Sequence, residues 1–194
     1  MIVLIDYNAG NVTSLCNALE RLGADVQVSS DPELIRKAEK VIFPGQGAAG
    51  AGMEALRERG LVEVLKTIQV PFLGICLGMQ LLFDSSEENE TQGLGVLPGR
   101  VERFKNTNFK IPQMGWNSVK QVDGSPLFKD IPDEAFFYFA NSYRAPLNDA
   151  MIGLGLYGEP FCAAVQKENF FGVQFHPEKS GENGLKILSN FLAL

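Results

Sequence analysis

The first half of the chain alternates short continuous apolar runs with stretches in which apolar residues recur every three or four positions. Continuous apolar runs are typical of strands buried on both faces, and the longer spacing is typical of amphipathic helices. This alternation predicts parallel β-α-β units. The predicted strands cover residues 2–6, 26–29, 41–44 and 71–75, and the predicted helices cover 12–22, a short segment from 31, 53–65 and 77–83.

The second half shows short stretches of alternating polarity, which predict antiparallel strands. We therefore expect a single domain over residues 1–194, with an α/β fold on an open sheet that has a parallel core and antiparallel strands in the second half. The alternating stretches lie around 101–104, 118–122, 136–139 and 162–166, and a further strand at 170–175 precedes an amphipathic helix at 181–194.

Composition and charge exclude several classes of function. The 194 residues are 45% hydrophobic and 21% charged, with a net charge of -6, so no basic surface is available for nucleic acid or an anionic membrane. The longest apolar stretch, 70–83, is too short to span a bilayer and contains Pro71, Gly74 and Gly78. Three irregularly spaced cysteines fit neither a disulfide framework nor a zinc site. We expect a cytoplasmic protein without metal or cofactor.

Few residues are available for nucleophilic chemistry. Cys16 lies on the apolar stripe of the first helix and Cys162 lies in an apolar strand, so both are expected in the core. Cys76 is different, because it is the third residue of Gly74-Ile-Cys-Leu-Gly78 and follows a strand. This spacing is typical of a nucleophile elbow, in which close packing excludes side chains on either side of the nucleophile. The alternative is a buried cysteine between two packing glycines.

The only histidine of the chain, His176, begins the segment His176-Pro-Glu178 after a predicted strand. Pro177 favours an extended chain, so the imidazole and the Glu178 carboxylate should share a face, as a cysteine-histidine-acid triad requires. Both Cys76 and His176 follow strands, and active sites of open α/β sheets lie at the carboxyl ends of strands. The loop 45–47 follows a third strand and could supply an oxyanion N–H group, although it could also be a plain turn.

These motifs resemble the class I, or triad, glutamine amidotransferases, and the resemblance spans nearly the whole chain. It implies that the Cys76 thiolate attacks glutamine to form a thioester, with His176 and Glu178 completing the triad. It implies an oxyanion hole at Leu77, Gln46 and Gly47. The residues that it implies for binding glutamine are Gln80, Glu88, Asn141, Ser142 and Tyr143.

Segments 6–11, 112–117, 138–143 and 176–180 are further similar to the glutaminase subunits of imidazole glycerol phosphate synthase. This similarity implies a role in histidine biosynthesis, in which a (βα)8-barrel cyclase forms a heterodimer with the glutaminase and receives ammonia through a channel. The products would be imidazole glycerol phosphate and AICAR. The residues implied to face the cyclase are Asn11, Trp116, Asn117 and Lys179, with a core position as the alternative for Trp116.

The chain departs from the family at Gln113 and Asn141, where histidine is usual. Neither position belongs to the triad, but both lie in segments that the family uses near glutamine and the partner. Three alternatives therefore stay open: a paralogue that supplies ammonia to a related synthase, for example in sugar amidination; a catalytically weak subunit that activates its partner; and a stand-alone cysteine hydrolase.

Overall fold

The computed structural model of the chain describes residues 1–7, 12–105, 108–122 and 124–194. The strands are β1 Ile2–Ile5, β2 Val26–Ser29, β3 Lys40–Phe43, β4 Phe72–Ile75, β5 Phe83–Ser86, β6 Thr91–Gln92, β7 Leu97–Arg103, β8 Gln113–Gln121, β9 Ala135–Asn141, β10 Tyr143–Arg144, β11 Met151–Tyr157, β12 Glu159–Lys167 and β13 Phe170–Val173. The helices are α1 Val12–Arg21, α2 Pro32–Arg36, α3 Ala49–Glu58, α4 Val62–Lys66, α5 Leu77–Gln80 and α6 Gly181–Leu192, with 3-10 turns η1 Glu88–Glu90, η2 Pro126–Phe128 and η3 Pro177–Lys179.

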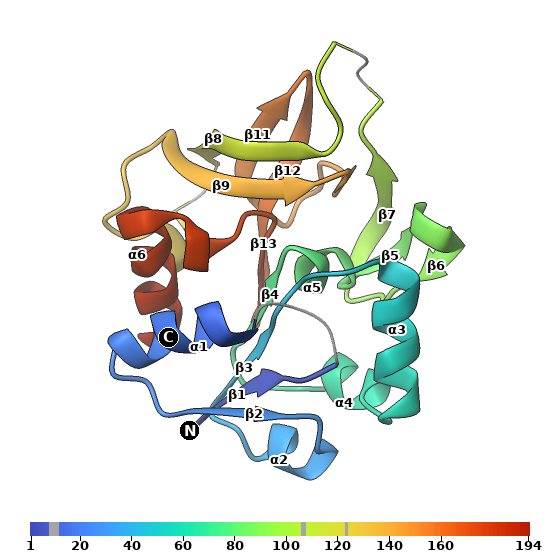
Figure 1. Cartoon of the computed structure of the whole chain (residues 1–194), viewed down its shortest axis with the longest axis vertical. Coiled ribbons are helices and arrows are strands. Elements are labelled where there is room, and N and C mark those ends of the chain that lie inside the picture. The colour runs from blue at the N-terminus through green and yellow to red at the C-terminus, as the bar shows by residue number, and fades with distance from the viewer. Residues whose placement is uncertain (8–11, 106–107, 123) are drawn as a thin grey trace.

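Most of the strands join one sheet in the order β2-β1-β3-β4-β13-β12-β11-β8-β9, and a smaller sheet has the order β10-β7-β5-β6 (Figure 1). The first five strands of the large sheet run parallel, and the last four are antiparallel to their neighbours. The predicted fold class, a parallel core extended by antiparallel strands, is thus confirmed.

Helices cover both faces of the parallel part, with α1 and α6 on one face and α3 and α4 on the other (Figure 1). The reason is visible within β1, whose residues are all apolar but alternate between the two cores. Ile2 and Leu4 pack in the core under α1 and α6, whereas Val3 and Ile5 pack in the core under α3 and α4. A strand buried on both faces needs a continuous apolar run, as the sequence shows.

Some predicted boundaries were wrong for reasons of packing. The helix predicted over 77–83 ends at Gln80, because Phe83 begins β5, which pairs with the distant β7. The helix predicted over 53–65 is two helices, separated by Gly60 at φ +66°. Strand β11 was missed because it contains Gly153 and Gly155, and a Cβ at Gly155 would overlap the Phe161 ring. Contacts with residues distant in sequence decide the first and third cases, whereas the break at Gly60 is a local turn.

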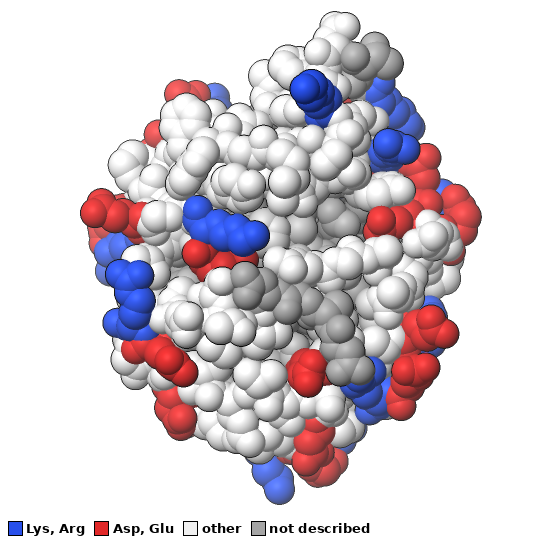
Figure 2. Space-filling model, in the orientation of Figure 1, with Lys and Arg blue, Asp and Glu red and all other residues white. Residues whose placement is uncertain are grey.

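The charges on one face of the molecule agree with the expectation that no basic surface is available. On the face shown in Figure 2, Lys and Arg side chains are interspersed with Asp and Glu around the rim, and the centre carries few charges. Within the described ranges, no helix combines the length and the apolar character needed to cross a membrane.

Candidate active site

Cys76 lies on the tight turn between β4 and α5, as predicted. Its φ of +50° and ψ of -104° are strained for a residue with a side chain. A Cβ at Gly74 would lie 2.5 Å from the Gly78 carbonyl oxygen, and a Cβ at Gly78 would overlap the Phe43 carbonyl oxygen. The two flanking glycines are therefore required by backbone packing, and this is the physical reason for the spacing that singled out Cys76.

His176 is brought to Cys76 by strand pairing. Strands β4 and β13 are parallel neighbours, with Ile75 opposite Val173, so the residues after both strands meet at one edge of the sheet. His176 Nδ1 lies 2.9 Å from Glu178 Oε1, and both side chains are buried. A carboxylate can only accept, so Nδ1 donates to Glu178 and leaves Nε2 for the hydrogen bond with Cys76.

The electrostatics of the group favour a charged imidazole. Burial alone would lower the pKa of His176, but hydrogen bonds with Cys76 and Glu178, together with the negative charges there, raise it to about 10. Cys162 has the opposite character, because complete burial raises the pKa of its thiol to about 12. Cys16 packs against the core but stays partly exposed, and burial also raises the pKa of its thiol. Of the three cysteines, only Cys76 contacts an imidazole.

A pocket of about 90 Å³ opens beside Cys76. All five residues that the family resemblance implies for glutamine binding line it, although they come from segments more than fifty positions apart. The lining residues are Gly47, Cys76, Leu77, Gln80, Glu88, Ala140, Asn141, Ser142 and Tyr143. The pocket thus combines a thiol, amide groups and a carboxylate, which together can bind a small molecule that has charged and amide groups.

The loop after β3 meets the pocket only in part. Gly47 lines the pocket, with φ at +111°, whereas Gln46 does not. The Gln46 N–H group donates to the Tyr7 hydroxyl at 2.9 Å, and the same hydroxyl donates to the Gln46 carbonyl oxygen at 2.7 Å. Burial raises the pKa of Tyr7 to about 12, so this hydroxyl stays protonated and can donate. In this structure the Gln46 N–H group is therefore directed at Tyr7.

Two residues of the site were not singled out from the sequence. Gln174 is completely buried, and its Nε2 lies 3.5 Å from Cys76 Sγ. A signal existed, because Gln174 stands two positions before His176 and residues two apart in an extended segment share a face. Tyr7, which follows the first strand, carried no comparable signal, since its contact with Gln46 depends on the pairing of β1 with β3.

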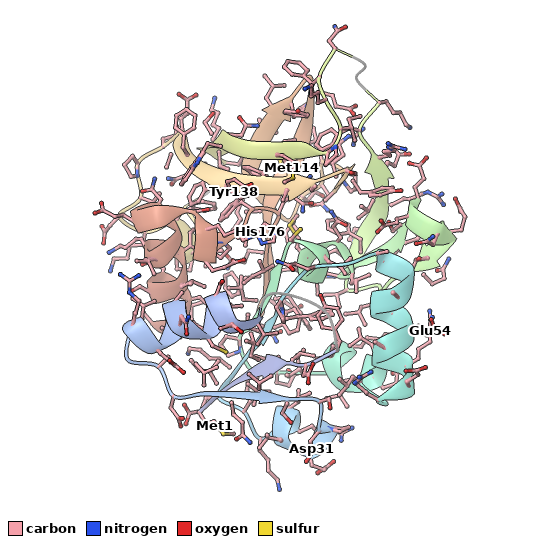
Figure 3. All side chains as sticks on the ribbon, in the orientation of Figure 1. Met1, Asp31, Glu54, Met114, Tyr138 and His176 are labelled. Atoms are coloured by element: carbon pink, nitrogen blue, oxygen red, sulfur yellow. The ribbon has the colours of Figure 1, made fainter. Side chains whose placement is uncertain are left out.

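The residues implied to face a partner lie around β8 and β9. Trp116 is 56% exposed, which excludes the core alternative, and its ring packs edge to face on Tyr138. Lys179 is exposed, and its Nζ atom lies 5.9 Å from the centroid of the ring of Tyr138, which is labelled in Figure 3. Asn117 is less available, because its Nδ2 donates to the Leu156 carbonyl oxygen at 2.9 Å. Asn11 lies outside the described residues.

The two departures from the family face each other. Gln113 is paired directly with Asn141 across β8 and β9, and both side chains are buried. Asn141 Nδ2 donates to the Tyr143 carbonyl oxygen at 2.8 Å. Both amide atoms of Gln113 and the Asn141 carbonyl oxygen have no partner within the described parts of the chain. The two amides together leave three unsatisfied polar atoms, and Asn141 also lines the pocket.

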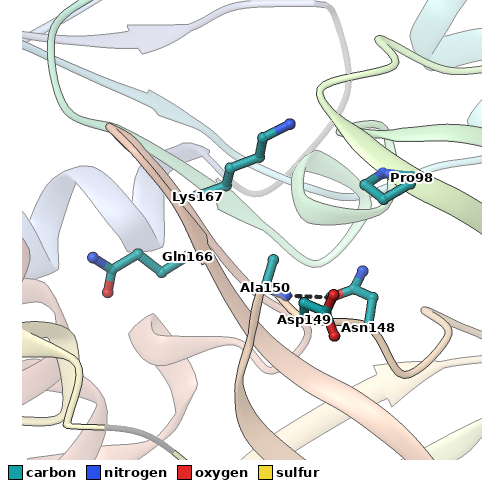
Figure 4. A pocket seen from close by; sticks show the side chains of 6 residues that line it. All are labelled: Pro98, Asn148, Asp149, Ala150, Gln166 and Lys167. Carbon is teal, nitrogen blue, oxygen red and sulfur yellow. Dashed lines mark hydrogen bonds between the residues drawn. The ribbon is translucent and has the colours of Figure 1, made fainter.

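A larger hollow lacks comparable chemistry. Its volume is about 430 Å³, it is lined by Asn148, Asp149, Gln166 and Lys167 among others, and it contains none of the predicted site residues (Figure 4). Across the residues with a described position, no cluster of His, Cys, Asp and Glu is arranged to hold a metal ion.

Comparison with known proteins relates this geometry to a family. Residues 3–194 match the family described as glutamine amidotransferase class-I. The chain is 48% identical over 202 residues to imidazole glycerol phosphate synthase subunit HisH of Maridesulfovibrio salexigens, covering 98% of this chain and 95% of that one. It is 46% identical over 194 residues to subunit HisH of Escherichia coli K12, covering 100% of this chain and 99% of that one.

Among solved structures, PurLQS from Thermotoga maritima shares the fold with a TM-score of 0.78 at 21% identity, covering 99% of this chain and 97% of that one. At this identity the likeness concerns the fold alone. The sequence similarity goes further, because it extends over the full chain at more than twice that identity. The chain belongs to the class I glutamine amidotransferases.

Proposed function

We propose that the chain is a glutaminase that hydrolyses glutamine to glutamate and ammonia, with Cys76 as the nucleophile, His176 as the acid and base, and Glu178 as the group that orients the imidazole. The observation that carries the proposal is a buried histidine that hydrogen-bonds both a carboxylate and a strained thiol beside a pocket. A surface turn or a packing cysteine would explain neither of these two contacts.

The reaction follows from these contacts. The Cys76 thiolate attacks the carboxamide carbon of glutamine, and the carbonyl oxygen takes the negative charge. As the first residue of α5, Leu77 has an N–H group with no partner inside the helix, so it is available for this oxyanion. The charged His176 donates its proton to the departing nitrogen, and ammonia leaves behind a thioester. His176 then takes a proton from water, which attacks the thioester and releases glutamate.

The pocket residues are proposed to hold the amino acid end of glutamine. Glu88 is partly buried, and one of its carboxylate oxygens accepts the Ala49 N–H group at 2.7 Å, which fixes the carboxylate at the pocket wall. The Glu88 carboxylate is suited to the α-ammonium group of glutamine. The segment 141–143, where β9 ends and β10 begins, adds polar groups to the lining of the same pocket. The remaining binding residue, Gln80, lies between these elements at the end of α5.

The acceptor of ammonia is proposed to be a (βα)8-barrel cyclase in a heterodimer, with ammonia passed through an internal channel. The support comes from relatives at 46–48% identity whose names make them subunits of imidazole glycerol phosphate synthase. The exposed Trp116 and Met114 give β8 an apolar outer face suited to a partner. In this role the enzyme would act in histidine biosynthesis in the cytoplasm, and the pair would make imidazole glycerol phosphate and AICAR.

A second candidate partner is favoured by one observation, the buried amide pair Gln113 and Asn141 in place of the usual histidines. The amide pair would suit a paralogue that supplies a related synthase.

The test combines the purified chain with the cyclase encoded in the same genome. Glutamine-dependent formation of imidazole glycerol phosphate that Cys76→Ala abolishes, with ammonia-dependent formation retained, supports the histidine role. Glutamate release without any imidazole product would contradict that role and favour the paralogue.

A further inference from the structure

Gln174 is a buried amide that contacts two residues lining the pocket, the nucleophile Cys76 and Gln80. It follows β13, and its backbone N–H group donates to the Ala163 carbonyl oxygen at 2.8 Å, so its place is fixed by the sheet. Its side chain is fully shielded from solvent. The Nε2 atom lies 3.5 Å from Cys76 Sγ, and the Oε1 atom accepts from Gln80 Nε2 at 2.8 Å. Among described residues, Cys76 is the only hydrogen-bond partner of that Nε2 atom.

The direction of these hydrogen bonds is set by a backbone carbonyl. Gln80 Nε2 also donates to the Tyr143 carbonyl oxygen at 3.1 Å. A carbonyl oxygen can only accept, so the amide nitrogen of Gln80 must face Tyr143 and its second hydrogen must face Gln174. Gln174 then has to present its oxygen to Gln80 and its nitrogen to Cys76. The order Tyr143, Gln80, Gln174, Cys76 thus permits only one orientation of each amide.

We propose that Gln174 is a catalytic hydrogen-bond donor that stabilises the Cys76 thiolate, held in the donating orientation by Gln80 and the Tyr143 carbonyl group. This inference rests on the proposed glutaminase function. An N–H donor aimed at sulfur favours its charged form over the neutral thiol.

The arrangement also links substrate binding to the nucleophile. Gln80 lines the pocket and uses both amide hydrogens on Tyr143 and Gln174, so its oxygen is the atom left for the substrate. A purely structural role for Gln174 would not need this polarity. An amide buried this deeply costs stability unless its groups are paired, and a thiolate is a stronger acceptor than the carbonyl groups used elsewhere.

The test compares Gln174→Met, which keeps the shape but removes the donor, with Gln174→Glu, which places a second anion beside the sulfur. The matched control is Asn190→Leu, because Asn190 is also a buried amide and donates to the Leu127 and Lys129 carbonyl oxygens away from Cys76. Each variant is studied as the full chain with its partner. Circular dichroism establishes folding, and mass spectrometry measures how fast iodoacetamide alkylates Cys76 between pH 5 and 10.

For Gln174→Met we expect alkylation at pH 7 to fall about tenfold and the midpoint of the pH profile to move upward. For Gln174→Glu the loss should reach about 100-fold. The kcat for glutamine should fall in parallel and by a larger factor than any rise in KM, because Gln174 contacts the sulfur directly and the substrate only through Gln80. Asn190→Leu should leave the alkylation profile and the kcat unchanged.

An unchanged alkylation midpoint in folded Gln174→Met would overturn the proposal, as would an equal shift in Asn190→Leu. If Gln174→Glu does not fold, Gln174→Met alone decides. The proposed function fails separately, when the wild-type complex releases no glutamate from glutamine or when Cys76→Ala still releases it. The alkylation profile does not depend on turnover, so the two failures are distinguishable.

Discussion

Replacing Gln113 by methionine should stabilise the protein, which is unusual for a buried position in a sheet. Gln113 is 2% exposed, and neither of its amide atoms has a hydrogen-bond partner in the described protein. Methionine has nearly the same length and shape but carries no group that needs hydrogen bonding. The substitution therefore removes two unsatisfied atoms without opening a cavity.

The magnitude follows from the cost of such groups. Each buried unsatisfied donor or acceptor costs about 1–3 kcal/mol, and imperfect repacking of the methionine costs up to about 1.5 kcal/mol. We expect the free energy of unfolding to rise by about 1–2 kcal/mol. In a protein of this size the melting temperature should rise by about 2–8 °C.

The assay is urea unfolding of the free chain followed by circular dichroism, with Gln121→Met as the matched control. Gln121 Nε2 donates to the Ile131 carbonyl oxygen at 2.8 Å and to the Pro132 carbonyl oxygen at 3.2 Å, so its loss should lower stability by about 1 kcal/mol. If Gln113→Met is destabilised as much as the control, the Gln113 amide has a partner such as a bound water, and the reasoning is refuted.

Four further results are expected. Cys76→Ala should abolish glutamate release while Cys162→Ala retains it, measured by a coupled glutamate assay on folded variants. Glu178→Gln should lower kcat less than His176→Ala, because the carboxylate orients the base and carries no proton in the reaction. The pKa of His176 is raised in the folded state to about 10, so the charged imidazole should stabilise the fold fully below about pH 6.5 and lose this effect as the pH rises through 10. In urea unfolding, the free energy of unfolding of a His176→Gln variant should lack this dependence on pH. The Gln46 N–H group points at Tyr7 and not at the position of the oxyanion, so the free chain should turn over glutamine about 100- to 1,000-fold more slowly than the complex saturated with partner and acceptor ligand. Equal rates would contradict this.

The strands of the parallel half could be predicted almost completely from the sequence. Strands such as 41–44 and 71–75 are continuous apolar runs, because both of their faces are covered by helices. Residues 77–83 were mispredicted because Leu81, Leu82 and Phe83 carry the same apolar content as a helix. Whether such a run becomes a helix or a strand depends on pairing with β7, which is not encoded locally. The prediction of one domain over residues 1–194 stays a prediction.

For the site, the sequence indicates the residues whose neighbours constrain them. Cys76 is marked by glycines that backbone packing requires, and His176 is marked by its uniqueness and by Pro177. Gln174 carried a weaker signal, its place two positions before His176, whereas Tyr7 carried none, because its contact with Gln46 depends on strand pairing. The resemblance to the family named Gln46 as an oxyanion donor, but the hydrogen bond to Tyr7 could be seen only in three dimensions. The roles of all these residues stay predictions.

Strand β9 connects the surface proposed for the partner with the chemistry at His176. The Tyr138 ring packs on the exposed Trp116, while the Tyr138 carbonyl oxygen accepts the His176 N–H group at 2.8 Å. Ser180 completes the attachment, because its hydroxyl accepts the Tyr138 N–H group at 2.9 Å and donates to the His176 carbonyl oxygen at 2.6 Å. The same strand ends at Asn141 in the pocket wall. A partner that packed on Trp116 of β8 would therefore reach β9 through the Tyr138 ring, and a shift of β9 would move both the backbone of the base and one side of the substrate pocket.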